Sequence, residues 1–542
     1  MWPKVPSFVV GARALRAPWD DVVVRAFDDL VAEAASADVA GWGFGWLDGR
    51  ASEERPPWGY AKLLAGRLGR VGSALDVDTG GGEVLGEVGR FPPFDGSWSH
   101  WMTPGGCNNG GMDSWLPARL LDLDPAGIEI TGPSDALESR YEVTGLLTSA
   151  VATAGLAAAE WMGAQGLGRP AVGVDSRAAA AAGSSIAFAR VGGNPVSEWG
   201  PLSGFARAED GWVRLHANYD HHRDVLCAVL DIPAERSALD VAVGQWRARE
   251  LEDALAAAGG VGVAVRTPQE WAETSQGQAV ATSPLVSVDE RGSGHSTIRP
   301  PRVLDLTRVL AGPVGTRMLG LLGADVLRLD RPDRPEQDFF IDTGLAKRSA
   351  LVDLRTYDPE HLAAEADVVV IGYRPGSLSA LREVIDRYPQ LVVVELCAWG
   401  FDGPWRERRG FDSLVQAATG ISVGCGSADK PGALPVQALD HATGYLVAAC
   451  AWHGLARRAA DGRGRHYRLA LAHTAAWLGL PRESPCGAAD LDPLLQTMSG
   501  GYGETVVLRA PITFDGVIPS WPSAAERPGS SRAEWRDGVS AR

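Results

Sequence analysis

Short apolar runs alternate with longer amphipathic stretches between residues 301 and 397. The apolar runs, which are rich in β-branched residues, lie at 302–307, 325–330, 349–354, 367–372 and 391–397. Helices are expected between them, at 312–324, near 358–365 and near 377–388. Strands that are apolar along their whole length are typical of parallel sheets covered on both faces. The pattern therefore predicts an α/β fold whose large domain is doubly wound and Rossmann-like.

The chain on either side of this pattern predicts other kinds of structure. Residues 201–287 mix strands and helices, and they predict a smaller α+β domain. Residues 288–301, VDERGSGHSTIRPP, are rich in Gly, Ser and Pro and predict a linker. The large domain is expected at 302–482, and residues 483–542 are expected to be mostly irregular.

An internal similarity relates two alanine-rich helices when the chain is shifted by 299 residues. Thr144-Gly145 then falls on Thr443-Gly444, and the triplet at 155–157 falls on an identical Gly-Leu-Ala triplet at 454–456. The shift also brings Tyr141 onto Asp440. We predict that residues 96–200 are a degenerate helical copy of the large domain, without the carboxylate.

Length, charge and cysteine usage narrow the class of protein. The 542 residues suffice for several domains, and the formal net charge is -16. Such a charge disfavours phosphate backbones and anionic membranes, so neither a nucleic acid nor a membrane is expected as a partner. The six cysteines include no CxxC pair, which argues against a disulfide framework or a zinc site. Since no signal-peptide pattern and no apolar run of about 18 residues is present, we expect a cytoplasmic protein.

Six motifs follow one another from residue 303 to 449. They are VLDLTRVLAGPVGTRMLGLLGADVLRLDRP, AKRSALVDL, YRPGSL, CAWGFDGPW, FDSLVQAATG and LDHATGYLVAA. In this order they resemble the large domain of the class III CoA-transferases, the CaiB/BaiF family. The smaller domain resembles the family's second domain through DGWVRLHANYDHHRDVL and VRTPQEW. The arrangement departs from the common one, because here the smaller domain precedes the complete large domain.

The resemblance implies that Asp440 is a covalent nucleophile. It would form a mixed anhydride with the acyl group of an acyl-CoA, and then an aspartyl-CoA thioester. A nucleophilic carboxylate must be ionised, and the N–H groups of a helix N-terminus favour the charged form. The alternative interpretation is that Asp440 only caps the helix, because Asp is one of the commonest capping residues.

The resemblance also implies how coenzyme A, the substrate that carries the acyl group, is bound. Val309, Leu310 and Ala311 match the family's contacts to the adenine and pantetheine. Arg331, Lys347 and Arg374 match the contacts to the polar part, and we expect them at the carboxyl ends of parallel strands.

The predicted function is the transfer of CoA from an acyl-CoA to a small carboxylic acid, without a metal or redox cofactor. The resemblance implies a homodimer, although one rearranged chain could supply both lobes of a site. Two alternatives remain open. One is an acyl-CoA racemase or isomerase, in which a His and an Asp together abstract the proton next to the thioester. The other is a non-catalytic fused scaffold.

Other motifs predict different chemistry. The stretch ALDVDTGGGEVLGEV at 74–88 resembles a methyltransferase loop for S-adenosylmethionine, but no second strand with an acid follows about 20 residues later. We therefore interpret 1–95 as a truncated methyltransferase-like segment without methyltransferase activity. HANYDHHRD at 216–224 contains possible metal ligands, and a polar helix start explains it better. Cys450 and His453 lie in an apolar run and are expected to be buried. The role of His441, beside Asp440, stays open.

Overall fold

The structure, a computed structural model, describes residues 112–196, 199–294, 300–336, 340–487, 491 and 493–536. The chain divides into two compact units, Met1–Pro93 and Phe94–Arg542, and every described residue belongs to the second unit. The predicted methyltransferase-like segment at 1–95 lies outside the described residues.

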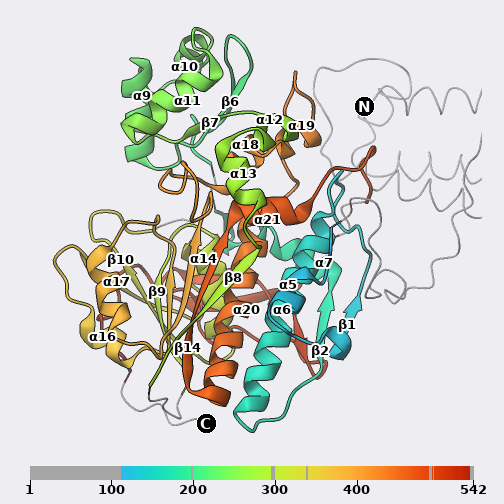
Figure 1. Ribbon diagram of the computed structural model, residues 1–542, viewed down its shortest axis with the longest axis vertical. Coiled ribbons are helices and arrows are strands. Elements are labelled where there is room, and N and C mark those ends of the chain that lie inside the picture. The colour runs from blue at the N-terminus through green and yellow to red at the C-terminus, as the bar shows by residue number, and fades with distance from the viewer. Residues whose placement is uncertain are drawn as a thin grey trace, which may run out of the picture. The chain divides into compact units, whose positions relative to one another are not determined.

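The main sheet of the described chain has seven strands, in the order β11-β10-β9-β12-β13-β14-β8 (Figure 1). Its parallel strands are β9 (Arg302–Leu306), β10 (Asp325–Asp330), β11 (Arg348–Leu351), β12 (Val368–Ile371), β13 (Val392–Cys397) and β14 (Arg463–Ala470). In sequence order the six parallel strands read 3-2-1-4-5-6, which is the doubly wound Rossmann order. The fold class predicted for the large domain is confirmed.

Helices cover both faces of this sheet. α14 (Ala311–Leu321) and α20 (Ala438–Asp461) pack on one face, and α16 (Glu360–Glu365) and α17 (Ser379–Asp386) pack on the other. The large domain also contains α15 (Phe340–Thr343), α18 (Asp412–Ala418), α19 (Ile421–Cys425) and α21 (Leu471–Leu478). Successive strand residues point to opposite faces: Val303 packs in the core that contains α14 and α20, whereas Leu304 packs with α16 and α17. Both faces are therefore apolar, as the uninterrupted strand patterns predicted.

Strand β8 (Val286–Ser293) overturns part of the predicted linker at 288–301. It pairs antiparallel with β14 at the edge of the main sheet. Most of its side chains are exposed or half-buried. An edge strand is stabilised by backbone hydrogen bonds to its neighbour, so it can be polar along most of its length. The hydrophobic pattern therefore did not predict it.

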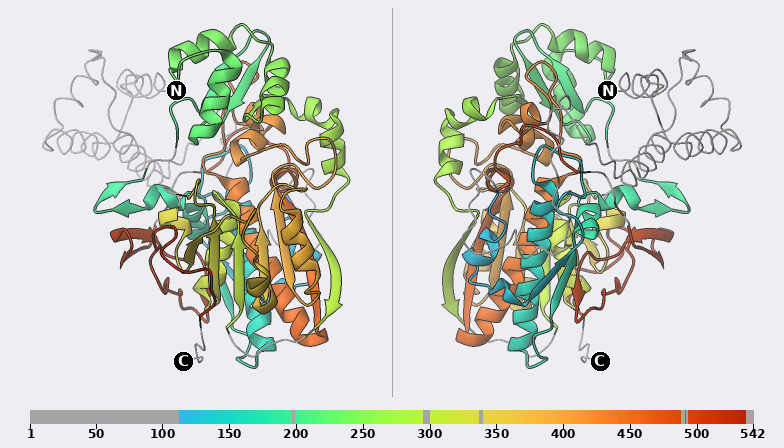
Figure 2. Two further views of the ribbon diagram at one scale, coloured as in Figure 1. Left: turned by 90° about the vertical axis from the view of Figure 1, so that its left-hand side faces the viewer. Right: turned by 90° about the vertical axis from the view of Figure 1, so that its right-hand side faces the viewer.

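The smaller domain has the α+β character predicted for it. Its sheet has the order β5-β6-β7, from Gly204–Arg207, Trp212–Leu215 and Gly262–Ala264. Its helices are α9 (Asp220–Leu230), α10 (Arg236–Val243) and α11 (Ala248–Ala258), and α12 (Pro268–Ala272) and α13 (Ser275–Ala281) lead back to the main sheet. Figure 2 shows α9 to α11 in green, beyond one end of the main sheet. A separate apolar core stabilises this domain.

Helix α6 (Val143–Ala164), the first helix of the predicted duplication, packs along α20, the second. The ring centroids of Trp161 and Trp452 are 4.6 Å apart. Around α6 lie α5 (Leu116–Leu120), η2 (Pro125–Gly127), β1 (Ile128–Thr131), β2 (Val172–Asp175), α7 (Ser176–Ala182) and α8 (Ser185–Phe188). Among the described helices, α6 alone is long and apolar enough to cross a membrane, yet 94% of its apolar window is buried in the protein. It is a core helix.

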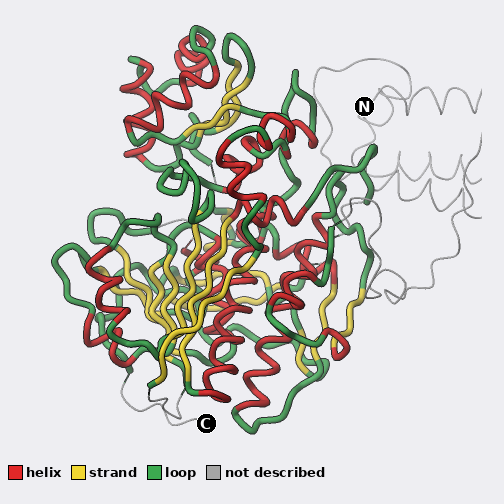
Figure 3. Tube along the Cα trace, in the orientation of Figure 1, coloured by secondary structure: helices red, strands yellow, loops and turns green. Residues whose placement is uncertain are grey.

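The C-terminal part contains strands that its composition did not predict. β15 (Leu495–Gly500) and β16 (Gly503–Leu508) form a hairpin, which extends through β3 (Arg190–Val191) to β4 (Asn194–Pro195). β17 (Thr513–Phe514) pairs with β2. Figure 3 shows the strands of the main sheet side by side in yellow, and Figure 2 shows the C-terminal strands in dark red. The predicted irregular segment therefore holds a hairpin inside mostly irregular chain.

Candidate active site

A cavity of about 410 Å³ opens at the carboxyl ends of the parallel strands of the main sheet. Thr307 follows β9, Arg331 follows β10, Tyr373 follows β12, and Cys397 ends β13. The strand order reverses between β9 and β12, and ligands of doubly wound proteins bind at such a reversal. The position of the cavity thus follows from the topology of the sheet.

Both domains of one chain line this cavity. Tyr219, His221 and His222 come from the start of α9 in the smaller domain. The remaining lining residues come from the large domain, and they include Asp440. One chain therefore supplies both lobes.

Asp440 is the third residue of α20 and lines the cavity with 7% of its surface exposed. It does not cap its helix. The N–H groups of Leu439 and Asp440 donate instead to one oxygen of Asp412, at 2.9 and 3.1 Å. Asp412 is itself held by the side-chain amide of Gln416. Because Asp412 takes the capping role, the alternative interpretation of Asp440 as a cap is wrong.

The two buried carboxyl groups influence each other. Burial raises the pKa of Asp440 well above its ordinary value, and the charge of Asp412 raises it further. Burial raises the pKa of Asp412 to about 6, although the N–H of Asp440 and the amide of Gln416 oppose the shift. The expectation that helix N–H groups hold Asp440 ionised is therefore wrong, since Asp412 takes those N–H groups.

The loop from β9 to α14 forms one wall of the cavity. Val309, Leu310 and Ala311 all line it, so the structure brings the three predicted contact residues to Asp440. Val309 has a φ of +66°, in the left-handed region. At Gly312, an added Cβ would lie 2.4 Å from the Thr307 side chain, so the loop turns too tightly for a larger residue.

Arginines surround the opening of the cavity. Two predicted ones line it: Arg331, which pairs with Asp333 at 2.6 Å, and Arg374, which donates to the backbone oxygen of Glu407 at 2.9 Å. Sequence interpretation missed five more, which are Arg308, Arg334, Arg355, Arg408 and Arg409. The run RERRG at 406–410, between two of the motifs, was the available signal for the last two.

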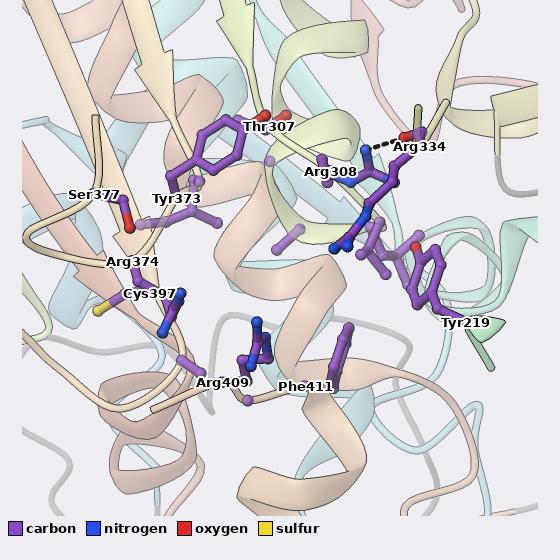
Figure 4. A pocket seen from close by; sticks show the side chains of 18 of the residues that line it. Tyr219, Thr307, Arg308, Arg334, Tyr373, Arg374, Ser377, Cys397, Arg409 and Phe411 are labelled. Atoms are coloured by element: carbon purple, nitrogen blue, oxygen red, sulfur yellow. Dashed lines mark hydrogen bonds between the residues drawn. The ribbon is translucent and has the colours of Figure 1, made fainter. Parts of the chain in front are cut away.

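The charge of this cluster is only partly neutralised. Burial lowers the pKa of Arg409, and the charges of Arg374 and Arg334 lower it further. In the described part of the chain, no carboxylate lies within ion-pair distance of Arg374 or Arg409. Figure 4 shows the side chains of Arg334, Arg374 and Arg409 extending toward the cavity from separate segments. The arrangement favours an anionic ligand.

Lys347 does not reach the cavity, so its predicted contact with CoA is wrong. Its ammonium is fully buried, 3.0 Å from Asp305 and 2.8 Å from the backbone oxygen of Pro313. Burial lowers the pKa of Lys347 to about 8. The residue precedes β11 and so lies at that strand's amino end, whereas the cavity opens at the carboxyl ends. Lys347 stabilises the β9–α14 loop from behind.

His441, whose role the sequence left open, is fully buried. Neither imidazole nitrogen has a hydrogen-bond partner among the described residues, and the residue is absent from those that line the cavity. Burial lowers its pKa well below the ordinary range, and the charge of Arg317 adds to this. Because its neutral imidazole does not line the cavity, we do not assign His441 a contact with a substrate held there.

Cysteines and other histidines offer no better nucleophile. Burial raises the pKa of Cys397, which lines the cavity, to about 12, so its thiol stays neutral. Cys450 is buried, and His453 hydrogen-bonds through Nδ1 to the hydroxyl of Tyr467 at 2.7 Å. The stretch HANYDHHRD contains the first residue of α9, Asp220, and so it is the polar helix start that was predicted. Within the described ranges, no group of three or more His, Cys, Asp or Glu residues is placed to hold a metal ion.

Comparison with known proteins yields one family and several relatives. Residues 300–482 match the family model of CoA-transferase family III. A probable fatty acyl-CoA transferase of Mycobacterium tuberculosis is 32% identical over 184 residues, which cover 30% of this chain and 47% of the relative. A mouse succinyl-CoA:glutarate CoA-transferase is 34% identical over 187 residues, which cover 30% and 42%. An acyl-CoA transferase of Gibberella moniliformis is 28% identical over 310 residues, which cover 49% and 54%.

Solved structures of related proteins align with about a third of the chain. The crystal structure of the M. tuberculosis protein aligns with a TM-score of 0.31 at 32% identity, over 33% of this chain and 54% of that chain. A CaiB/BaiF family protein of Brucella suis aligns with a TM-score of 0.30 at 29% identity, over 38% and 64%. The chain spans about half the length of the curated relatives it matches.

Proposed function

Because residues 300–482 form a domain of CoA-transferase family III, we propose that the chain moves CoA from an acyl-CoA to a carboxylic acid, with Asp440 as the nucleophile. One observation carries the proposal. Asp440 lines the same cavity as the loop 309–311 and Arg374, at the reversal of the strand order. Of the acidic residues in that cavity, Asp353 is paired with Arg355, whereas Asp440 has no cationic partner within 4 Å among the described residues.

The proposed reaction has two exchanges on the Asp440 carboxylate. An oxygen of Asp440 attacks the thioester carbon, the C–S bond breaks, and CoA leaves as a thiolate. The thiolate then attacks the Asp440 carbonyl carbon of the mixed anhydride, which releases the donor as a free acid and leaves an aspartyl-CoA thioester. The acceptor acid reverses these steps, so that it leaves as the new acyl-CoA and Asp440 is regenerated.

Binding of CoA is assigned to the loop and the arginines. We propose that Val309, Leu310 and Ala311 contact the adenine and pantetheine. The phosphates would bind Arg331 and Arg374, joined by Arg409, whose charge has no carboxylate partner among the described residues. Guanidinium groups suit phosphates because they offer several N–H donors in one plane.

Asp412 supports the chemistry of Asp440 in this proposal. It accepts the first N–H groups of α20, so both oxygens of Asp440 remain available for attack. Asp440 must react as its carboxylate, and its pKa is raised by burial. We therefore expect transfer to fall as the pH is lowered through this raised pKa.

The class of the acceptor follows from the relatives only in general terms. Those with named substrates act on succinyl-CoA and glutarate, succinyl-CoA and malate, or formyl-CoA and oxalate. We propose a small carboxylic acid as acceptor, a homodimer as the assembled form, and the cytoplasm as the location.

Trapping the covalent intermediate tests the proposal. The protein is incubated with each of a panel of acyl-CoA thioesters, beginning with succinyl-CoA, in the presence of hydroxylamine. Mass spectrometry should then find a hydroxamate at position 440, only when a thioester is present. Asp440→Asn should form no hydroxamate and transfer no CoA, while the surface control Asp386→Asn behaves as the wild type does. Turnover by Asp440→Asn would refute the assignment.

An acyl-CoA racemase or isomerase is the second candidate, favoured by one observation. His222 lines the same cavity as Asp440, its Nδ1 has no hydrogen-bond partner among the described residues, and burial lowers its pKa, so its imidazole is neutral. Exchange of the α-proton of an acyl-CoA for deuterium, without acyl transfer, would favour this activity. A protein that neither binds CoA nor catalyses exchange would act as a scaffold.

A further inference from the structure

Tyr219 makes one of the hydrogen bonds that join the smaller domain to the wall of the cavity. Tyr219 precedes α9, and its hydroxyl donates to Oε1 of Glu336 at 2.6 Å. Glu336 belongs to the large domain, in the segment that follows β10, and only 2% of it is exposed. Tyr219 also lines the cavity, as Figure 4 shows. The contact therefore lies where the two domains meet beside the proposed substrate.

The second oxygen of Glu336 holds the loop assigned to CoA. Oε2 accepts the backbone N–H of Val309 at 3.0 Å. Val309 has a φ of +66°, a conformation that is unfavourable for a β-branched residue and persists only where the surroundings hold it. One carboxylate thus contacts the smaller domain with one oxygen and the strained loop with the other.

Charges around Glu336 keep this connection intact. Arg328 and Arg308 lie 3.4 and 3.6 Å from Oε2. Burial alone would raise the pKa of Glu336, but the two arginines and the two hydrogen bonds lower it, so the carboxylate stays ionised. Burial and the charge of Glu336 raise the pKa of Tyr219, so its hydroxyl stays a donor. The lowered pKa of Glu336 and the raised pKa of Tyr219 keep both groups in one protonation state near neutral pH.

We propose that Glu336 is a positioning residue: it couples the docking of the smaller domain, through Tyr219, to the left-handed conformation of Val309. The proposal rests on the proposed function only in assigning the loop 309–311 to CoA. Its structural part, the coupling between Tyr219 and the loop, stands independently of the ligand. Two measurements separate the parts.

Hydrogen exchange of the unliganded protein tests the coupling. The variants are Tyr219→Phe, Glu336→Gln and the pair together. Tyr388→Phe is the matched control, because Tyr388 donates to Glu360 at the same 2.6 Å, away from the cavity. The peptide that covers 306–312 should exchange faster in Tyr219→Phe and in Glu336→Gln, by about tenfold at the Val309 amide. It should not change in Tyr388→Phe. Unchanged exchange in Tyr219→Phe would overturn the coupling, even if Glu336→Gln folds poorly.

Calorimetric titration with free coenzyme A tests the consequence for binding. The dissociation constant should rise about tenfold in Glu336→Gln and less in Tyr219→Phe. The double variant should bind no more weakly than Glu336→Gln, because Tyr219 acts through that residue. Additive losses, or affinities within twofold of the wild type, would contradict a positioning role. If the wild type binds no CoA while the exchange result holds, the proposed function fails and the coupling stands.

Discussion

Asp440 and Asp412 are two buried carboxyl groups in contact with the first turn of one helix. Each raises the cost of charging the pair, because both lie in a medium that solvates charge poorly. A carboxylate held in such a place is destabilised when ionised, and it is correspondingly reactive toward an electrophile. The arginines around the cavity provide the opposite charge that an anionic substrate requires.

Because Asp440 is buried next to Asp412, we expect the carboxylate that transfer requires to lower the free energy of unfolding. The folded pKa of Asp440 is raised above its value in the unfolded chain, about 3.9. Its neutral form therefore contributes stability at low pH, and this contribution is lost as the pH rises through the raised pKa. Asp440→Asn, which does not titrate, should be about as stable as the wild type at pH 4. At pH 8 we expect it to be more stable by about 1 to 3 kcal/mol.

Urea denaturation at both pH values measures this difference. Asp386→Asn serves as the control, because the Asp386 side chain is 73% exposed and should give no pH-dependent difference. A less stable Asp440→Asn at pH 8 would contradict the account of the pair.

At this scale the sequence predicted part of the site. Asp440, the loop 309–311 and two arginines were found because they lie in motifs. Lys347 was misplaced, although it precedes the predicted strand 349–354 in the sequence and therefore lies at the amino end of that strand. Asp412 was missed because the hydrogen bond that defines its role joins residues 27 and 28 positions apart, which no local spacing reveals.

Among the elements, α14 and α20 determine where Asp440 lies. The two helices approach closely at glycines: an added Cβ at Gly444 would lie 2.5 Å from the backbone oxygen of Ala311. One at Gly315 would lie 2.6 Å from the backbone oxygen of Gly444. The Thr-Gly pair that follows Asp440 in the sequence is therefore explained by helix contact.

Gly444→Ala should separate these helices and displace Ala311, a residue of the CoA loop. We expect a loss of about 1 to 3 kcal/mol in the free energy of unfolding, because the clash is with backbone atoms. Gly163→Ala in α6 is the matched control: its Cβ would lie 3.7 Å from Arg169, an ordinary contact. It should be neutral or stabilising by up to about 1 kcal/mol. Equal effects of the two changes would refute the close-contact argument.

Elements differ in how well the sequence predicts them. Four of the five predicted apolar strands were found within one residue at each end, because burial on both faces leaves a continuous apolar run. The strand predicted at 349–354 is Arg348–Leu351 and ends three residues earlier. Strand β8 and the hairpin β15–β16 were not found, because their residues are largely exposed and their backbone pairing leaves no periodic signal.

For the whole molecule, the decisive feature is that Tyr219 and Asp440 line one cavity of one chain. A site that needs no second chain for either lobe should remain active whatever the state of assembly. Tyr141, the residue in the position of Asp440 in the predicted first copy, is buried beside α19 and offers no carboxylate. Each chain should therefore carry one nucleophile.

Dilution tests this expectation directly. Specific activity should stay constant within about twofold from micromolar to nanomolar protein, even where the proposed homodimer dissociates. Hydroxylamine trapping should saturate at one modified aspartate per chain. A sharp fall of activity on dilution, in parallel with dissociation measured by mass photometry, would mean that a partner contributes to the site.

The presence of both lobes in one polypeptide also bears on inheritance. Where two subunits share one active site, an inactive subunit can also abolish the activity of the wild-type subunit that is paired with it. Here a cell that makes Asp440→Asn chains alongside unaltered ones should keep the full output of the unaltered ones, so that loss-of-function alleles behave as recessive.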